Sequence, residues 1–483
     1  MLDRDLMMAV LDTALKKGGQ FAEIYIEDRK TSNILCDDDR IEKINSGREI
    51  GAGIRLIKEG RTFYVYTNDL SREGLIRAAA LVSHGVDGSC PLSRPSVELR
   101  SIDAGMPVNF RRWPQKVDLA EKIDYVLKAN QAARDLSDEI RQVTVAAGDL
   151  SKRVQIANSD GDYLEDETAR VRLTVNAIAV RGGQVQTGQE VVGGVSGWEL
   201  LEGVSVEDLA NQAARRAIAM LSAAPAPAGC MPVVMHADAG GTMIHEACGH
   251  GLEADLVNKG LSVYRDKLDQ LVASPIVTVI DDATLPGKYG SYRWDDEAVP
   301  AQRTLLIENG YLRGFLHDRL SAAKTGAGLT GNGRRESYME KPMPRMSNTF
   351  IAPGRDDPSS IIRDTARGLL VKKMGGGQVN TANGDFVFDV QEGYVIENGE
   401  ISYPVRGATL IGNGPRTLMD IDRVGSDMGF AIGVCGKDGQ GVPVGDAQPT
   451  IRIRELTVGG TSMSDGPIIR KTGKGRCVGW KLY

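Results

Sequence analysis

Two histidines flank a glutamate in the segment His245-Glu246-Ala-Cys-Gly-His250. Neutral imidazoles bind zinc well, and zinc lowers the pKa of a bound water to about 7. A carboxylate beside the metal can accept the proton of that water and pass it to a leaving amine. The chain has only five histidines in 483 residues, so chance rarely produces such a pair. The segment therefore predicts a hydrolytic zinc site with His245 and His250 as ligands and Glu246 as the catalytic base.

The spacing of the two histidines is unusual. In the common HExxH motif they are four residues apart, which places them about 40° apart around a helix. Here they are five residues apart, or about 140° around a regular helix, so both could not easily face one metal. The spacing predicts an irregular helix, with either a π-bulge or an end near Gly249 that leaves His250 in a turn. Gly249 and Gly251 would ease either arrangement.

A third protein ligand must come from elsewhere, because two histidines leave a catalytic zinc one ligand short. Glu253 follows His250 by three residues, and Cys435 ends an apolar stretch beside a glycine-rich segment. Spacing alone favours these two equally. Cys248 is more typical of a small buried hydrophobe. The remaining candidates are Asp255, His236 and His317.

The elements around this motif indicate an α+β protein with more than one domain. Residues 1–221 show the order helix, strands, helix twice, in about 1–90 and 115–221, which predicts an α/β N-terminal domain of mixed strands and helices. Residues 222–232 are rich in alanine and proline and are typical of a linker. Residues 233–483 are rich in glycine and short apolar runs, and they predict a β-rich, sandwich- or barrel-like C-terminal domain that carries the zinc site.

Local patterns give finer expectations for the strands. Residues 143–147 and 153–157 are interpreted as two separate strands, with a turn at 158–161. Four Asn-Gly pairs in the second half of the chain predict tight turns, because both residues tolerate a positive φ.

Bulk composition excludes several classes of protein. The net charge is −6 and the sequence pI is about 5.6, which argues against direct nucleic-acid binding. Six scattered cysteines without a CxxC pair indicate reduced thiols rather than a disulfide framework. Neither a secretory signal nor a run of about 18 apolar residues is found, so we expect a cytoplasmic protein without a membrane segment.

At the level of motifs, the chain resembles the TldD/PmbA family of metallopeptidases, which are sometimes described as modulators of DNA gyrase. The branch it resembles is the TldD type, which carries the metal motif. The resemblance covers most of the chain and is strongest after residue 230. The matching motifs include His245-Glu-Ala-Cys-Gly-His-Gly-Leu-Glu253, Asp295-Asp-Glu297, Thr330-Gly-Asn-Gly-Arg-Arg-Glu-Ser-Tyr338 and Cys435-Gly-Lys-Asp-Gly-Gln440.

The resemblance implies a zinc ion held by His245, His250 and Cys435, with Glu246 as the base. It thus favours Cys435 over Glu253 as the third ligand and leaves Glu253 as a supporting residue or an extra ligand. It also implies a zinc-dependent metalloprotease that hydrolyses peptides or unfolded protein segments. Such subunits typically form a dimer around an enclosed cavity, and here the partner would be a TldE/PmbA-type paralogue or a second copy.

This chain departs from the family pattern at Cys248, at Asp446-Ala447, where small residues are usual, and in a long tail after Gly460. None of these positions is a proposed ligand. They leave the choice of substrate and the contacts with a partner open.

Other interpretations of the same residues stay open. A regulatory or binding protein could carry a structural zinc site, which normally takes four protein ligands, for example with Glu253 added. A metal hydrolase could also act on substrates other than peptides. The glycine-rich segments 375–377 and 331–335 lack a phosphate-loop pattern, so we interpret them as turns or as backbone close to a bound peptide. An extended peptide on a strand edge would be held by main-chain hydrogen bonds.

Overall fold

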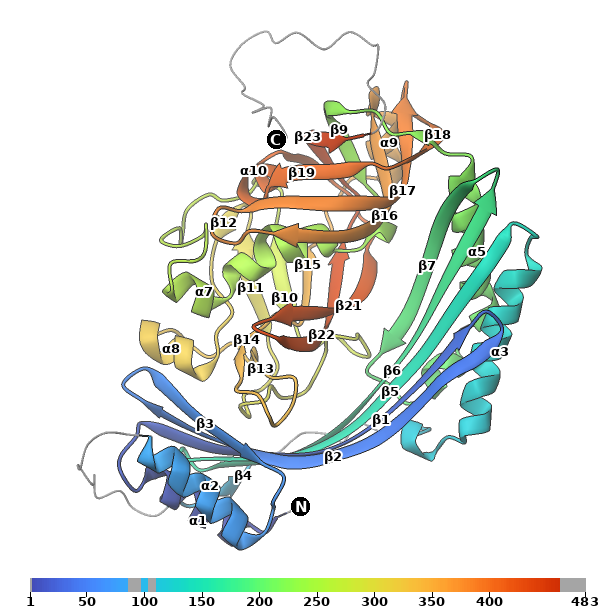
Figure 1. The fold of residues 1–483 in the computed structure, drawn as a ribbon. Helices are drawn as coiled ribbons and strands as arrows, with labels where there is room; N and C mark the ends of the chain where they lie inside the picture. Colours follow the sequence, from blue (N-terminus) through green and yellow to red (C-terminus); the bar gives the residue numbers. More distant parts are fainter. Residues whose placement is uncertain (1, 86–96, 103–109, 461–483) are drawn as a thin grey trace.

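In the computed structural model, which describes residues 2–85, 97–102 and 110–460, a long curved sheet forms one side of the molecule (Figure 1). Its strands follow the order β3-β2-β1-β5-β6, and both β4 and β7 pair with β6. All these pairings are antiparallel except that of β4 with β6. The strands are β1 (Phe21–Asp37), β2 (Arg40–Lys58), β3 (Arg61–Thr67), β4 (Arg100–Ser101), β5 (Ile140–Asn158), β6 (Asp162–Arg181) and β7 (Gln184–Gly194).

Two pairs of helices cover the outer face of this sheet, one pair at each end (Figure 1). Helices α1 (Arg4–Leu15) and α2 (Arg72–His84) pack at one end, while α3 (Leu119–Asp135) and α5 (Val206–Leu221) pack at the other. Each of the four begins at an Asp or Ser whose side chain accepts a hydrogen bond from a backbone N–H of the first turn. Each pair forms its own apolar core with the strands beneath it.

The expectation of two separate strands at 143–147 and 153–157 was wrong. Both lie in the single strand β5, which pairs with β6 almost throughout its length. The last five residues of β5 are all buried, so this part lacks the alternation that marks a strand with one face in water. The expected turn at 158–161 is confirmed, with Gly161 at φ +92°.

A closed barrel of five strands forms the upper part of the C-terminal domain in Figure 1. The order of strands around the barrel is β16-β9-β23-β19-β17, where each strand pairs with the next. The pairing of β16 with β17 closes the ring. The expectation of an α+β protein with a β-rich, barrel-like C-terminal domain is thereby confirmed. The bounds are β9 (Gly229–Met235), β16 (Arg367–Val379), β17 (Asp385–Glu397), β19 (Thr409–Asn413) and β23 (Ile451–Gly459); β8 (Ala224–Pro225), β18 (Glu400–Arg406) and β20 (Ile421–Val424) extend the sheet.

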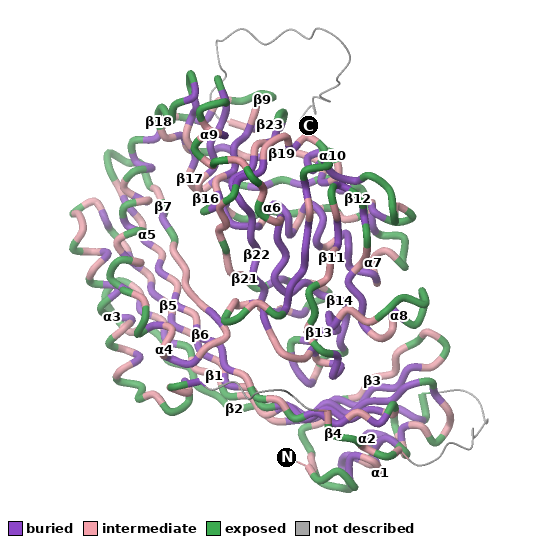
Figure 2. The backbone as a smooth tube through the Cα atoms, turned by 180° about the vertical axis from the view of Figure 1, so that it is seen from behind, coloured by how far each residue is buried: buried purple, intermediate pink, exposed green. Residues whose placement is uncertain are grey.

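A second C-terminal sheet packs against the barrel and shares its apolar core. Its order is β12-β11-β10-β15-β22-β21, so β21 is an edge strand. Figure 2 shows that most of β22 is buried, whereas most of β21 is not. The strands are β10 (Val279–Asp282), β11 (Arg303–Glu308), β12 (Tyr311–Leu312), β15 (Asn348–Ile351), β21 (Gly429–Lys437) and β22 (Gln440–Gln448), and a small hairpin is formed by β13 (Gly333–Arg334) and β14 (Met343–Pro344).

Two of the four Asn-Gly pairs form turns in which both residues have a positive φ. Asn309-Gly310 joins β11 to β12, and Asn398-Gly399 joins β17 to β18. In the other two pairs the asparagine has no positive φ, and the side chain of Asn332 is instead buried against Asp281.

The C-terminal domain lies within the inner curve of the long sheet (Figure 1). Residues of the expected linker take part in the C-terminal sheets: Ala224–Pro225 pairs with β18, and the residues from Gly229 onward form β9. The tail noted after Gly460 lies outside the described residues. In the described part of the chain, no helix is long and apolar enough to cross a membrane.

Candidate metal centre

The segment that carries both histidines is an irregular helix, as the spacing predicts. A short turn, α6 (Thr242–Ile244), leads into a π-helix, η3 (His245–Gly249), and then a 3₁₀ turn, η4 (His250–Leu252). The backbone N–H of His250 donates to the carbonyl of His245, five residues earlier. This π-type turn brings residues five apart onto the same side of the helix. The prediction of an irregular helix is confirmed, and of the two arrangements left open the structure has the π-type turn.

Tight packing behind the helix explains one of the glycines in the motif. A Cβ atom added at Gly249 would lie 2.1 Å from Sδ of Met346, too close for two unbonded atoms. The glycine therefore lets the helix lie directly on Met346, which is fully buried.

Three donor atoms converge beside this helix. Sγ of Cys435, in β21, lies 3.3 Å from Nε2 of His245 and 3.4 Å from Nε2 of His250. One donor atom from each residue lies within 4.8 Å of the other two. Among the described residues, this is the one group of three or more His, Cys, Asp and Glu side chains that meets this criterion.

This arrangement fits zinc. With a Zn–S bond of about 2.3 Å, a Zn–N bond of about 2.05 Å and a tetrahedral angle, the sulfur and each nitrogen should be about 3.6 Å apart. The two observed separations of 3.3 and 3.4 Å are close to that value. Imidazole and thiolate are both ordinary ligands of zinc, and three protein ligands leave a fourth position to water or substrate, as in catalytic sites.

In each histidine the second ring nitrogen, Nδ1, contacts a carboxylate that orients the ring. Nδ1 of His245 lies 2.7 Å from a carboxylate oxygen of Asp446, and Nδ1 of His250 lies 3.0 Å from Glu253. A carboxylate on Nδ1 fixes the ring orientation and leaves Nε2 free for a metal, as at many zinc sites. Asp446 reaches this position because β22 pairs with β21, the strand of Cys435.

A buried network lies behind Glu253. Its carboxylate is fully buried and lies 3.1 Å from Nζ of Lys437, which also contacts Asp255 at 2.6 Å. Burial alone would raise the pKa of Glu253, but His250 and Lys437 outweigh it and lower that pKa to about 2. Arg345 donates to the backbone carbonyl of Cys435, with Nε 4.0 Å from Glu253. The network thus connects two of the ligand segments.

The environment of Cys435 favours its thiolate. Burial alone would raise the pKa of the thiol, but hydrogen bonds with His245 and His250 outweigh burial and lower that pKa to about 5. The thiolate is the form that binds metals. By contrast, burial raises the pKa of Cys248 above its usual range.

Glu246 is half-buried and lines a cleft of about 580 Å³ together with the three donor residues. In the described part of the chain, its carboxylate forms no hydrogen bond or ion pair with another side chain. Burial raises the pKa of Glu246, as suits a group that both accepts and returns a proton. Residues of the edge strand β21 form one wall of the cleft.

The other candidate ligands take different positions. Sγ of Cys248 faces the carbonyl of Ile244 at 3.5 Å, and Nδ1 of His317 faces Ser321 at 3.3 Å. His236 caps a short 3₁₀ turn through the N–H of Asp238. Glu253, which spacing alone favoured as much as Cys435, contacts the side of His250 that faces away from the thiol.

Sequence reasoning missed the contact between Asp446 and His245. In the sequence, Asp446 is distinguished only as a departure from the family pattern, which usually has small residues at this position. A carboxylate three residues beyond Pro443 gives no signal by itself, because its position depends on the register of β22 against β21.

Comparison with known protein families covers most of the chain. A family model described as PmbA/TldA metallopeptidase domain 1 matches residues 22–84, the central domain matches 112–221, and the C-terminal domain matches 228–460.

Full-length relatives agree with these matches. A protein of Methanothermobacter thermautotrophicus named metalloprotease is 37% identical, and the alignment covers 95% of this chain and 100% of the relative. A metalloprotease TldD homolog of Haemophilus influenzae is 33% identical over 95% and 97%. A zinc metalloprotease TldD homolog of Saccharolobus solfataricus is 27% identical over 94% and 100%.

Solved structures share the fold. A Thermotoga maritima protein described as a candidate modulator of a DNA gyrase superposes with a TM-score of 0.77 at 24% identity, covering 95% of this chain and 100% of that one. TldE from Thermococcus kodakarensis superposes with a TM-score of 0.73 at 20% identity, covering 94% and 99%. On the family matches and the identity to the full-length relatives, the chain belongs to the TldD/PmbA family of metallopeptidases.

Proposed function

We propose that this protein is a zinc-dependent peptidase in which His245, His250 and Cys435 hold the metal and Glu246 is the catalytic base. The observation that carries the proposal is the convergence of two imidazole nitrogens and one thiol beside a carboxylate in an open cleft. The names of the relatives support it, since they include metalloproteases and one zinc metalloprotease.

Zinc bound by these residues would supply Lewis acidity, which activates water and polarises a carbonyl group. The chain's own contribution is orientation: Asp446 and Glu253 hold the two imidazoles through Nδ1, and β21 presents the thiol from the opposite side.

Glu246 would handle the protons of the reaction. Its carboxylate lines the cleft and has no side-chain partner among the described residues, so it can accept a proton from the attacking water. It then donates that proton to the amine that leaves when the peptide bond breaks. The raised pKa of Glu246, caused by burial, makes the second transfer easier.

The substrate in this proposal is an extended peptide or an unfolded segment of a protein. β21 is the edge strand of its sheet and forms a wall of the cleft from Ala431 to Lys437. A peptide lying along this edge could pair with the strand through main-chain hydrogen bonds, which require an extended chain but little side-chain specificity. Most of the backbone of a folded domain is already hydrogen-bonded within that domain and is not available for such pairing.

A partner subunit belongs to the same proposal. One protein that shares this fold is TldE, which supports pairing with a paralogue of that type. Pairing with a second copy of this chain is the other arrangement to be tested. Either dimer would restrict entry to the cleft and so favour unfolded substrates.

The alternative of a regulatory protein with structural zinc has less support. Structural zinc normally takes four protein ligands. Among the described residues three donor atoms converge, and Glu253 contacts the far side of His250 rather than adding a fourth donor.

The proposal is tested by measuring zinc content and the cleavage of an unfolded polypeptide by the chain alone and with its paralogue. We expect one zinc per chain, and activity that a chelator removes and added zinc restores. Stoichiometric zinc with no cleavage in any combination would favour the structural-zinc alternative.

A further inference from the structure

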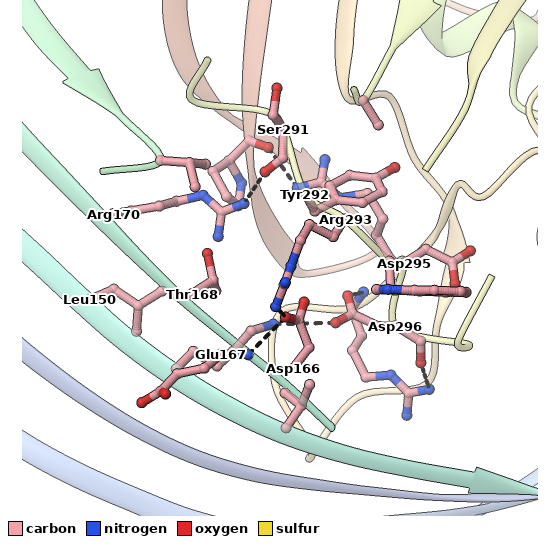
Figure 3. A pocket seen from close by; sticks show the side chains of 18 of the residues that line it. Leu150, Asp166, Glu167, Thr168, Arg170, Ser291, Tyr292, Arg293, Asp295 and Asp296 are labelled. Atoms are coloured by element: carbon pink, nitrogen blue, oxygen red, sulfur yellow. Dashed lines mark hydrogen bonds and ion pairs between the residues drawn. The ribbon is translucent and has the colours of Figure 1, made fainter. Parts of the chain in front are cut away.

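A second cavity, of about 330 Å³, lies between the long sheet and the C-terminal domain (Figure 3). Strands β5 and β6 form one wall, and the loop after β10 and the β13 region form the other. The cavity shares no lining residue with the metal cleft. Its volume is within the range of small-molecule sites, which begins at about 300 Å³.

Two buried guanidinium groups line this cavity without a carboxylate partner. Arg170 donates to the backbone carbonyls of Tyr289 at 3.1 Å and Ser291 at 2.8 Å. Arg334 donates to the carbonyls of Met346 and Pro443. Both side chains belong to residues that are less than a tenth exposed, and in the described part of the chain neither forms an ion pair.

The other basic groups around the cavity are paired differently. Arg293 contacts the carboxylate of Asp166, and Lys152 lies 3.2 Å from Asp296. Figure 3 shows the pair of Arg293 and Asp166 near Arg170, whose guanidinium donates to backbone carbonyl groups. Among the described residues, Arg170 and Arg334 are therefore the two cations lining the cavity that form no ion pair, although the negative charge of Asp296 acts on both.

A buried cation without an ion pair is unfavourable, because burial removes it from water and a more distant anion compensates its charge only in part. At Arg170, burial and then the positive charge of Arg334 lower the pKa to about 10, and the charge of Asp296 opposes this shift only in part. An anion bound between the two guanidiniums would relieve both effects, and a carboxylate fits the fork of donors that arginine offers.

We propose that this interdomain pocket binds a small ligand bearing a single carboxylate, held by Arg170 and Arg334. The carboxylates of Asp166 and Asp296 line the same pocket and would repel a doubly charged phosphate more strongly than a singly charged group. Apolar side chains complete the lining and suit an apolar body on the ligand. They are Leu150, Val154, Leu164, Trp294 and Val195.

The binding test uses isothermal titration calorimetry of the full-length protein with N-acetylphenylalanine and with its primary amide. These probes share an apolar body and differ in the carboxylate. We expect the acid to bind at least tenfold more tightly than the amide, since a hydrogen bond to a charged group contributes more than one to a neutral group. Equal affinities, or no binding of the acid, would overturn the proposal, as would tighter binding of inorganic phosphate.

Two substitutions test whether the acid binds at the proposed pocket. Arg170→Gln should weaken binding of the acid at least tenfold. Arg153→Gln is the matched control, because Arg153 lies on the neighbouring strand, pairs with Glu165 at the surface and does not line the pocket, so it should leave the affinity unchanged. Equal loss in both variants would contradict the assignment.

One further variant keeps both arginines and so avoids a loss of folding. Thr168 is two residues before Arg170 on β6, on the same face, and also lines the pocket (Figure 3). Thr168→Glu would place a carboxylate beside the guanidinium, so we expect a melting temperature at or above that of the wild type and no binding of the acid. Unchanged binding of the acid in Thr168→Glu would show that the ligand sits elsewhere, the metal cleft included.

Discussion

Two groups of buried ionisable side chains can be compared in this protein: the metal centre, and a charge cluster where the long sheet meets the C-terminal domain. The cluster alternates cations and anions. Arg55 pairs with Glu297 and lies 3.7 Å from both Glu23 and Asp318, and Arg335 lies 2.6 Å from Glu23. All five residues are at most 3% exposed.

The two groups differ in donor type and in access. In the charge cluster each guanidinium faces carboxylates, and all five side chains are buried. Because these ion pairs connect residues of the long sheet with residues of the C-terminal domain, they join the two domains. In the metal centre the converging atoms are imidazole nitrogens and a thiol, and they border a cleft. A concentration of buried charge therefore does not by itself identify a reactive site. Imidazole nitrogens and a thiol that border an open cleft are the better indication. Variants in the two groups should accordingly affect different properties.

The largest effect is expected from Glu246→Gln in the metal centre. The amide has the shape of the carboxylate but cannot accept the proton of water, so peptide cleavage should fall by about 10²- to 10⁴-fold. Zinc content and the free energy of unfolding should stay at wild-type values. Glu308→Gln, at a surface ion pair with Arg313, is the control. Cleavage by Glu246→Gln at the wild-type rate would exclude Glu246 as the base.

The charge cluster should respond to Arg55→Met with a loss of stability. The substitution leaves Glu23, Glu297 and Asp318 without their shared cation, which should lower the free energy of unfolding by about 3–5 kcal/mol. Urea denaturation measures this, and Arg153→Met at the surface should cost less than about 1 kcal/mol. If Arg55→Met lowered the zinc content but left the free energy of unfolding unchanged, the assignment of a structural role to the charge cluster would be wrong.

A smaller effect is expected from Asp446→Asn, which weakens the hold on His245. Loss of a carboxylate behind a metal-binding histidine typically lowers metal affinity about 10- to 100-fold. Competition with a zinc chelator measures the change. Asp438→Asn is the matched control, because Asp438 is exposed in the turn between β21 and β22 and has a φ of 49°, which asparagine accepts. Equal zinc affinities of the two variants would show that Asp446 does not support His245 in binding the metal.

The smallest effect, taken per pH unit, is the pH dependence of stability. Burial raises the pKa of Glu297 to about 7, although Arg55 opposes the shift. Because the folded-state pKa lies above that of the unfolded chain, the stabilisation is fully present below about pH 4.5 and is lost as the pH rises through about 7. The free energy of unfolding should fall by up to about 1.4 kcal/mol per pH unit in that window. Glu297→Gln should flatten this slope, and an unchanged slope would assign it to other groups.

The sequence alone predicts local chemistry better than distant contacts. The five-residue spacing of His245 and His250 predicts the irregular helix, because two rings that share one metal must face the same side. Spacing could not decide between Glu253 and Cys435; the family resemblance favoured Cys435, which the structure brings beside both histidines. Asp446 required the register of two paired strands.

The long strand β5 was misjudged for a related reason. Its final residues are covered on both faces, so the sequence there has no alternation to reveal a continuous strand. The pocket at Arg170 was equally beyond sequence reasoning, since it exists only where the sheet meets the loops of the other domain.

X-ray absorption spectroscopy at the zinc edge of the metal-loaded protein tests the central claim most directly. The account predicts one sulfur ligand at about 2.3 Å and two imidazole nitrogens at about 2.0–2.1 Å, with a fourth, non-protein ligand. The sulfur contribution should vanish in Cys435→Ser. A coordination shell without sulfur, or one completed by a fourth protein ligand, would contradict a catalytic zinc held by His245, His250 and Cys435.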